Sequence, residues 1–447
     1  MFFDWRSSEF KRSSNEWEHY PFAYRHYMSD DIDGLNCTLP TIMDFPNLLR
    51  QKSWIAIVVS FLVSMYLFVI LAIVCDDYLV PAMERLCYTL RMTYDVAGAT
   101  FLAASTSAPE LFVNFVGTFV TNGDIGLGTI VGSSVFNILA IAGVCGIFTQ
   151  PTKLDWWPVT RDTAWYLVAI GSLTSVLWDS LVMWYEAVVL LLLYFAYVIQ
   201  LFFDRRIQNL FRHEHAESEL LDEDPMTREE EPLKGFRDRV CAKPQPKSHF
   251  CQWTWWVIKY PAELMLACTV PSARSIFFLS MCFAVLWISM ISYLLAWFLT
   301  ILGYNLNIPD AIMGLTVLAA GTSVPEVASS YIVSKKGYGS MAICSAIGSN
   351  TFDIFVCLGL PWLLNILIYQ HKVVIDSTAL TFTTAMLVIT ASILYLCLLA
   401  SKLVMGKIVG WICVISYVLF LITACTLEML LSKENTCDIE DPNGFFY

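Results

Sequence analysis

Charged residues are scarce in this chain. Only 15% of its 447 residues are Asp, Glu, Lys or Arg, whereas 57% are hydrophobic. This composition excludes an ordinary soluble enzyme of several domains and indicates a protein that crosses a membrane many times. The chain also lacks a His-Glu-x-x-His zinc motif, a phosphate-binding loop and the Gly-x-Gly-Asp setting of intramembrane aspartyl proteases. No enzyme class and no cofactor is therefore expected.

A disulfide scaffold is not indicated, although the chain has 14 cysteines. Most of them, such as Cys145 and Cys397, lie within apolar stretches and are expected to behave as small hydrophobic residues. Cys37 and Cys437 are the candidates for a bridge. The net charge of −12 comes largely from acidic tails and the run 214–231, which we interpret as solvated segments, with no nucleic-acid partner expected.

Ten segments satisfy the requirement of roughly 20 mostly apolar residues for a membrane-spanning helix. Five precede a polar stretch at 205–260 and five follow it. The expected spans are 54–74, 95–120, 125–148, 162–178, 181–203, 274–301, 310–334, 340–366, 378–400 and 408–431. The expected fold class is an all-α polytopic membrane protein, built from two five-helix repeats with broken helices at an ion site.

The two halves are expected to be inverted, because an odd number of spans precedes the central loop. Loop Lys and Arg residues gather on one side, which the positive-inside rule assigns to the cytosol, although Arg50 and Lys52 stand on the other side. The polar central loop is expected to be a tether with an interfacial helix near 253–266.

This orientation divides the chain into five regions. They are an extracellular N-terminal tail at 1–52, a first half at 53–204 with its repeat at 95–148, a cytosolic loop at 205–272, a second half at 273–432 with its repeat at 310–366, and an extracellular C-terminal tail at 433–447. The sequon at Asn36 is a candidate glycosylation site, and its use would agree with an outside N-terminus.

An internal duplication carries the chemistry. Residues 97–143 match residues 313–359 without a gap, at a constant offset of 216. The matching motifs are Thr106-Ser107-x-Pro109-Glu110 with Thr322-Ser323-x-Pro325-Glu326, and Gly132-Ser133-x-x-Phe136-Asn137 with Gly348-Ser349-x-x-Phe352-Asp353. Polar residues at membrane depth are costly and usually functional, so a duplicated polar site indicates a transporter.

The repeats predict an all-oxygen site for a hard cation. Proline removes a backbone donor from a helix, so Pro109 and Pro325 are expected to break their helices and free carbonyls beside Glu110 and Glu326. Carboxylate, hydroxyl, amide and carbonyl oxygens suit Ca²⁺, and the lack of His or Cys at these positions disfavours zinc and copper. The expected ion-binding residues are Glu110, Glu326, Asp353, Asn137, Thr106, Ser107, Thr322, Ser323, Ser133, Ser349 and Asn350, with the carbonyls of Ala103 and Ala319.

Charge balance predicts obligatory exchange. Three ionised acids give the site a charge of minus three, which Ca²⁺ alone does not neutralise, whereas several Na⁺ ions, or Ca²⁺ with one monovalent ion, would. Unbalanced charge in a membrane interior costs several kcal/mol, so an empty site should resist the conformational switch. Glycines of the repeats, Gly98, Gly314, Gly143 and Gly359, are expected to serve helix packing instead.

At these motifs the chain resembles the cation/calcium exchanger superfamily, and within it the potassium-dependent sodium/calcium exchangers. Further phrases of that branch begin at Asp95, Trp157 and Gly348, and the resemblance covers 36–204 and 274–431. It implies that Na⁺ moving down its gradient drives Ca²⁺ and K⁺ the other way. It makes Glu110 and Glu326 the main acids and Asp353 the K⁺-linked acid, since the K⁺-independent branch has asparagine there.

Two residues depart from that pattern. Ser105 replaces the glycine that Gly321 keeps in the second repeat, which is expected to perturb the helix break. Glu326 stands where the K⁺-dependent branch more often has aspartate, which leaves the ion coupling open. A K⁺-independent Na⁺/Ca²⁺ exchanger, an H⁺/Ca²⁺ exchanger and, more remotely, a cation channel therefore remain alternatives.

The expected partners are the lipid bilayer and the ions Ca²⁺, Na⁺ and K⁺, with homo-oligomers left open. The sequence leaves the cellular membrane undecided between the plasma membrane, which we expect, and an internal membrane of Golgi or endolysosomal type.

Overall fold

Helices form nearly all of the structure, as the apolar segments predict. The computed structural model describes residues 54–89, 103–121, 125–179, 181–211, 250–270, 277–306, 308–335, 337, 339–370, 372–375 and 378–434. The chain forms two units, and the elements described here belong to Ile42–Leu431, apart from the end of the last helix. The tails, with Asn36, Cys37 and Cys437, lie outside the described residues.

The first half contains five helical segments, three of them interrupted. Its elements are α3 (Trp54–Val74), η2 (Cys75–Leu79), α4 (Val80–Thr89), α6 (Ala103–Thr106), α7 (Ala108–Val116), η4 (Gly117–Thr121), α8 (Ile125–Val135), η5 (Phe136–Ala140), α9 (Ile141–Phe148), β1 (Thr152–Lys153), α10 (Trp156–Val176), η6 (Leu177–Asp179), β2 (Leu181–Val182) and α11 (Trp184–Phe211). The helix α10 begins six residues before the predicted span, because Asp155 is extended and the helix starts at Trp156.

The second half repeats this order. Its elements are α13 (Phe250–Thr269), α14 (Phe277–Leu306), α15 (Asp310–Met313), η8 (Gly314–Leu318), α16 (Ala319–Thr322), α17 (Val324–Lys335), α18 (Gly339–Phe352), η9 (Asp353–Leu358), α19 (Gly359–Tyr369), β3 (Val373–Val374), α20 (Thr378–Ala400), β4 (Val404–Met405) and α21 (Lys407–Glu434). The helix predicted within the central loop is α13, and it packs on α3.

Eight helical segments in the described ranges are long and apolar enough to cross a membrane. They are Trp54–Met83, Ile125–Phe148, Trp184–Phe203, Phe278–Leu306, Asp310–Lys335, Gly339–Tyr369, Phe382–Ala400 and Lys407–Leu430. The other two predicted spans correspond to the helices at 103–121 and 156–176. The prediction of a polytopic helical membrane protein is confirmed.

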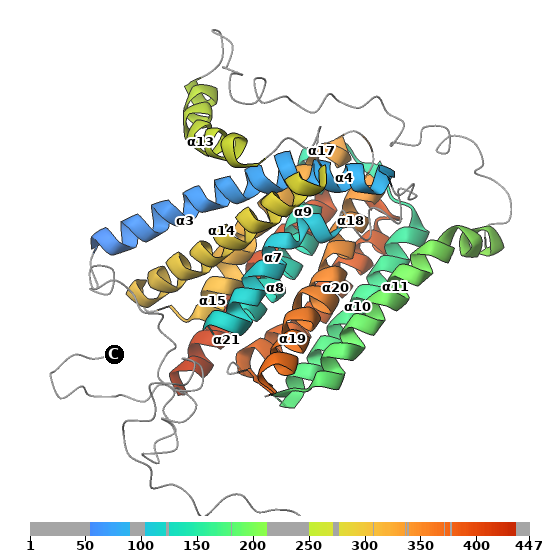
Figure 1. The fold of residues 1–447 in the computed structure, drawn as a ribbon. Helices are drawn as coiled ribbons and strands as arrows, with labels where there is room; N and C mark the ends of the chain where they lie inside the picture. Colours follow the sequence, from blue (N-terminus) through green and yellow to red (C-terminus); the bar gives the residue numbers. More distant parts are fainter. Residues whose placement is uncertain are drawn as a thin grey trace, which may run out of the picture. The chain divides into compact units, whose positions relative to one another are not determined.

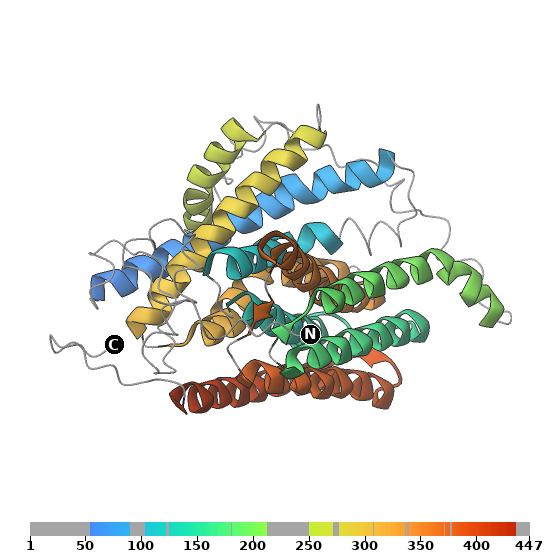
Figure 2. The same cartoon turned by 60° about the horizontal axis from the view of Figure 1, so that its bottom comes forward.

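The helices pack around two apolar cores. One core joins α3, η2, α13 and α14 through side chains such as Leu71, Leu266 and Ile288. The other joins α8 to α11 with α18 to α21, around residues such as Ile130, Tyr166 and Phe355. Figures 1 and 2 show α3 and α14 side by side, and α7 packs between α14 and α8 of the second core.

Two short antiparallel sheets join the halves, and the sequence analysis did not predict them. Thr152 pairs with Met405 in β1–β4, and Leu181 pairs with Val374 in β2–β3. By position, β1 is the counterpart of β3 and β2 is the counterpart of β4, so each sheet pairs loops that are not counterparts. Inversion explains this crossed pairing, because counterpart loops of inverted repeats lie on opposite sides of the membrane.

Glycine allows one very close helix crossing. A Cβ atom on Gly146 would stand 2.9 Å from the Cα of Gly410, and one on Gly410 would stand 2.9 Å from the carbonyl oxygen of Gly143, so α9 and α21 touch backbone to backbone. At the matching position of the second half, Gly359 packs against Leu190 of α11. The packing role predicted for these glycines is confirmed, as it is for Gly314, whereas Gly98 lies outside the described residues.

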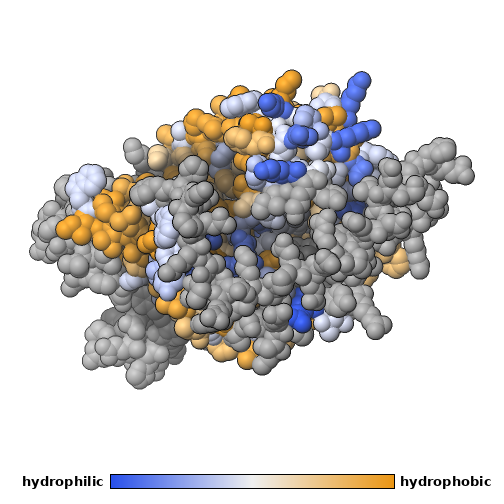
Figure 3. Space-filling view, turned by 90° about the horizontal axis from the view of Figure 1, so that it is seen from above, coloured by the Kyte–Doolittle hydropathy of each residue, from blue (hydrophilic) through white to orange (hydrophobic). Residues whose placement is uncertain are grey.

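Large apolar side chains cover much of the exterior. Trp54 is 81% exposed, Phe278 61% and Ile408 79%. Where Figure 3 shows the described residues from above, apolar side chains lie along the left and upper edges, and hydrophilic ones gather mainly at the upper right. Such apolar area is unfavourable in water and favourable against acyl chains, in accord with an integral membrane protein.

Candidate ion-binding site

The two repeats break their helices at the same place. Ser107 separates α6 from α7 with φ −91° and ψ 8°, and Ser323 separates α16 from α17 with φ −88° and ψ −1°. The near identity of these angles shows that Ser105 does not perturb the break, contrary to the expectation. Its counterpart Gly321 instead serves packing, because a Cβ atom there would overlap the ring of Phe68 on α3.

The prolines begin new helices rather than kink continuous ones. Pro109 and Pro325 are each the second residue of their helix, where an amide hydrogen would have no intrahelical acceptor, so the ring costs nothing. Each following glutamate therefore lies in a first helical turn, where the helix dipole stabilises negative charge.

The three acids of the repeats are buried. Glu110 is 1% exposed, Glu326 7% and Asp353 0%. Glu326 lies within electrostatic range of both other acids, and Asp353 lies within range of Glu110. The acids of the two halves thus face the interior together, and none points into acyl chains.

Polar neighbours of the acids follow the pseudo-twofold relation between the halves. Glu326 has Asn137 as a neighbour, and Glu110 has Asp353, which is the counterpart of Asn137. Each glutamate therefore meets a residue of the opposite repeat. This crossed arrangement brings Glu110, Glu326, Asp353 and Asn137 into one cluster, as the duplication predicts.

The carboxylate oxygens in this cluster have almost no hydrogen-bond partners. In the described ranges, none reaches either oxygen of Glu110 or Glu326, or the Oδ2 atom of Asp353. Thr322 is near Glu110, but its hydroxyl donates to the carbonyls of Leu318 and Ala319 at 3.1 and 3.3 Å. Buried polar groups normally find partners, so these oxygens are available to a ligand.

Four serines of the repeats have hydroxyl oxygens that could also bind an ion. Ser133 donates to the carbonyl of Ile130 at 3.2 Å, and its counterpart Ser349 donates to that of Ala346 at 3.1 Å. A hydroxyl whose hydrogen is bonded within its own helix can still offer its oxygen to a cation. Ser107 and Ser323 are fully buried, and within the described structure their hydroxyls have no partner.

Two amides join the halves at the centre of the site. Asn137 Nδ2 donates to Asn350 Oδ1 at 3.1 Å, and Asn350 Nδ2 donates to the carbonyl of Ser134 at 3.2 Å. Asn137 lies in η5 and Asp353 in η9, both π-helical, a form often found at functional sites. The Oδ1 atom of Asn137 has no partner among the described residues.

The carbonyl ligands are the weakest part of the prediction. The carbonyl of Ala319 accepts the amide hydrogen of Ser323 at 3.2 Å in addition to the Thr322 hydroxyl, so it is not freed by the helix break. Ala103 is the first residue of α6, and Thr106, the last residue of α6, is half-buried.

Two residues that the sequence analysis missed belong to this network. Cys357 Sγ lies 3.5 Å from Asp353 Oδ1, and Asn114 Nδ2 donates to the carbonyl of Cys357 at 2.6 Å. Each is four residues after an acid of the site, Asp353 or Glu110, and this helical spacing would have placed it on the same face. The buried thiol of Cys75 also lies within electrostatic range of Glu110 and Glu326.

Ligands beyond carboxylates are needed to hold an ion here. In the described part of the chain, no three His, Cys, Asp or Glu side chains are arranged closely enough to bind one metal ion. Amide, hydroxyl and carbonyl oxygens surround the carboxylates, and such mixed oxygen ligands suit hard cations.

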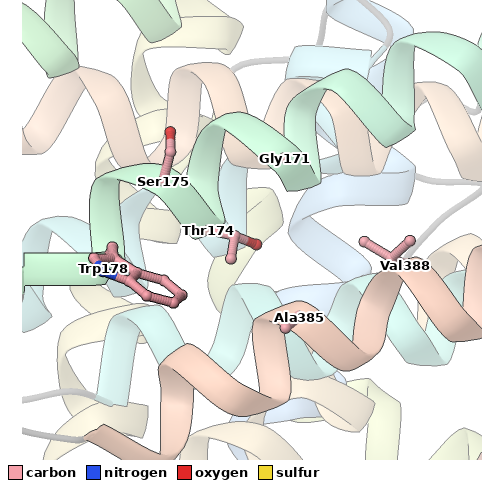
Figure 4. Close-up of a pocket in the computed structure, with 6 residues that line it drawn as sticks. All are labelled: Gly171, Thr174, Ser175, Trp178, Ala385 and Val388. Carbon is pink, nitrogen blue, oxygen red and sulfur yellow. The ribbon is translucent and has the colours of Figure 1, made fainter.

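A separate cavity of about 490 Å³ opens between α10 and α20 (Figure 4). Its lining residues are Gly171, Thr174, Ser175, Trp178, Ala385 and Val388. The hydroxyls of Thr174 and Ser175 donate to carbonyls of their own helix, at 2.8 Å each. No acid of the repeats lines this cavity, so it is not the ion site.

Comparison with known proteins agrees with the repeats. The family described as "Sodium/calcium exchanger protein" matches residues 60–203 and 276–426. The human protein named "Sodium/potassium/calcium exchanger 5" is 33% identical, over 86% of this chain and 87% of its own length. The mouse protein named "Sodium/potassium/calcium exchanger 4" is 30% identical, over 88% of this chain and 85% of its own length.

A solved structure has the same fold. It is titled "Crystal Structure of H+/Ca2+ Exchanger CAX", has a TM-score of 0.50 and 10% identity, and covers 88% of each chain. The fold, the duplicated motifs and these relatives together assign the chain to the sodium/calcium exchanger family, and within it to the sodium/potassium/calcium exchangers.

Proposed function

We propose that this protein is a secondary active antiporter that exchanges Na⁺ for Ca²⁺ together with K⁺. The observation that carries the proposal is the cluster of Glu110, Glu326 and Asp353, three buried acids from opposite repeats whose oxygens are almost all without partners. The names of the two relatives, both sodium/potassium/calcium exchangers, support the choice of the three ions.

The charge of the cluster accounts for coupled transport. Three ionised carboxylates need three positive charges, which one Ca²⁺ and one K⁺ supply together, as do several Na⁺ ions. A site left partly neutralised costs several kcal/mol in a low-dielectric interior. Only a fully loaded site can then pass from one side of the membrane to the other, and this makes exchange obligatory.

Different residues serve the two kinds of ion. Glu110 and Glu326 are related by the pseudo-twofold axis, and we assign them to Ca²⁺ and Na⁺. We assign the hydroxyls of Thr322, near Glu110, of Ser349, near Glu326, and of Ser133, the counterpart of Ser349, to the same ions. Asp353 breaks the symmetry, because its counterpart is the neutral Asn137. We assign the K⁺ requirement to this additional charge.

Alternating access follows from the inverted halves. Each glutamate meets residues of the opposite repeat, so a movement of one repeat against the other would change the site and its access together. We place both tails outside and the loop at 205–272, with α13, in the cytosol. The pairing of β1 with β4 and of β2 with β3 supports the inversion on which this orientation depends.

Flux measurements test the proposal. The full chain in Na⁺-loaded vesicles should take up Ca²⁺ when outside K⁺ is present, and should fail to do so when the Na⁺ gradient is removed. Uptake that needs Na⁺ but not K⁺ would instead indicate K⁺-independent exchange. Uptake driven by a pH gradient without Na⁺ would indicate an H⁺/Ca²⁺ exchanger, and unitary currents would indicate a channel.

A further inference from the structure

The thiol of Cys357 contacts the acid that breaks the symmetry of the site. Cys357 is 0% exposed, and its Sγ atom lies 3.5 Å from Asp353 Oδ1 and 3.8 Å from the carbonyl oxygen of Ser107. A thiol has one hydrogen to donate. The nearer and charged acceptor, Oδ1, is favoured because hydrogen bonds to ionised groups are stronger.

The two oxygens of Asp353 therefore differ. Oδ1 accepts the thiol hydrogen, whereas Oδ2 has no hydrogen-bond partner within the described structure, although the Ser107 hydroxyl also lies near this carboxylate. Each carboxylate oxygen has more than one lone pair, so Oδ1 can still bind an ion, but the thiol hydrogen makes it a weaker ligand than Oδ2. Divalent Ca²⁺ often binds carboxylates through both oxygens, so this asymmetry weakens the binding of a divalent ion at this acid more than that of a monovalent ion.

The backbone around the thiol is held from the other repeat. Asn114 on α7 donates to the carbonyl of Cys357 at 2.6 Å, and Ser107, near the sulfur, lies at the helix break before α7. Nothing equivalent exists at the counterpart positions, because residue 141 is Ile and residue 330 is Ser. The thiol contact thus occurs only in the half that carries Asp353, and not at Asn137.

We propose that Cys357 is a positioning residue that biases Asp353 toward binding an ion through Oδ2 and thereby favours a monovalent ion at this acid over Ca²⁺. The inference rests on the proposed function, since it concerns how the site divides its cargo between monovalent and divalent ions. The competing explanation is that Cys357 only fills space, as buried cysteines commonly do. The two explanations predict different ion preferences for a serine at this position, which has a hydrogen-bond donor but no sulfur.

The test compares variants that remove or keep the donor. Cys357→Ala and Cys357→Val lack a donor, and Cys357→Ser keeps one. Cys413→Ala is the control, since Cys413 on α21 is also 0% exposed and its electrostatic neighbour is Cys397, not an acid of the site. For each, the K⁺ and Ca²⁺ concentrations that give half-maximal uptake are measured in the same Na⁺-loaded vesicles.

Loss of the donor should raise the ratio of the half-saturating K⁺ concentration to that of Ca²⁺ by roughly three- to tenfold, the range expected for one ordinary hydrogen bond, since a thiol is a weak donor. Cys357→Ser and Cys413→Ala should stay within about twofold of the unaltered protein on the same scale. An unchanged ratio in the Ala and Val variants, or a Ser variant shifted as far as they are, would overturn the proposal.

The unaltered protein separates this inference from the proposed function. If Ca²⁺ uptake by the unaltered protein did not depend on K⁺, the proposed coupling to K⁺ would be refuted, whereas the role of Cys357 would still be open to a test. The same variants would then be compared through the Na⁺ concentration that half-inhibits Ca²⁺ uptake, and an equal value in Cys357→Ala and Cys357→Ser would overturn the role of the thiol.

Discussion

Replacing Glu110 with Gln should abolish Ca²⁺ transport and yet stabilise the ion-free protein. The side chain is 1% exposed and neither of its oxygens has a hydrogen-bond partner in the described ranges. Gln has nearly the same shape, so the substitution removes a charge and leaves the packing almost unchanged.

The size of the effect follows from the charge alone. A unit charge about 4 Å from another contributes about 4 kcal/mol at an effective dielectric constant of 20, and Ca²⁺ carries two charges. A loss of even 4 kcal/mol weakens binding roughly a thousandfold. In the absence of ions the same change removes repulsion between Glu110 and the two other acids, so the melting temperature should rise.

Both effects can be measured on one preparation. Ca²⁺ uptake into Na⁺-loaded vesicles gives the transport rate, and thermal unfolding with and without Ca²⁺ gives the stabilisation by the ion. The control is Glu186→Gln, because Glu186 Oε2 accepts the amide hydrogen of Met183 at the start of α11. The Gln oxygen can accept the same hydrogen bond, so stability should change by less than about 1 kcal/mol and flux should not change. Normal Ca²⁺ uptake by Glu110→Gln, or full stabilisation of that variant by Ca²⁺, would show that the Glu110 carboxylate does not bind the transported ion.

Other substitutions test separate parts of the structure. Asp353→Asn should weaken the dependence of Ca²⁺ uptake on K⁺ while uptake itself persists, and a K⁺ response equal to that of the unaltered protein would contradict the assignment. Gly410→Ala should lower the free energy of unfolding by about 1–3 kcal/mol, because its Cβ atom would meet Gly143, whereas Gly171→Ala, with open space around it, should be neutral or slightly stabilising; equal melting temperatures would argue against the close crossing. Asn137→Ala should leave Asn350 without its donor and lower the affinity for Na⁺ and Ca²⁺ at least several-fold, as read from half-saturating concentrations in flux assays.

The internal duplication made much of the fold and the acidic cluster predictable. A polar motif that is repeated at one offset within apolar segments is visible in the sequence, and it predicts the acidic cluster. The odd number of spans before the central loop predicts that the halves are inverted. The burial of Glu110, Glu326 and Asp353 agrees with that reasoning.

Contacts between the two halves could not be predicted from the sequence in the same way. The pairing of β1 with β4 involves strands of two residues, too short for any periodic pattern to show. The Ala319 carbonyl was expected to be free, but the helix that ends at Thr322 keeps it bonded. The spacing of four residues could have placed Cys357 on the same face as Asp353, but only the structure shows that its sulfur contacts Oδ1 of this acid.

The central claim is that buried acids of two inverted halves bind Na⁺, Ca²⁺ and K⁺ in turn. The most direct measurement is Ca²⁺ flux through the full chain in vesicles, with Na⁺ and K⁺ varied independently on each side. We predict Ca²⁺ uptake that needs Na⁺ on one side and K⁺ with Ca²⁺ on the other, and that disappears in Glu110→Gln. Ca²⁺ uptake that continues without either monovalent ion, or that survives the loss of this glutamate, would contradict it.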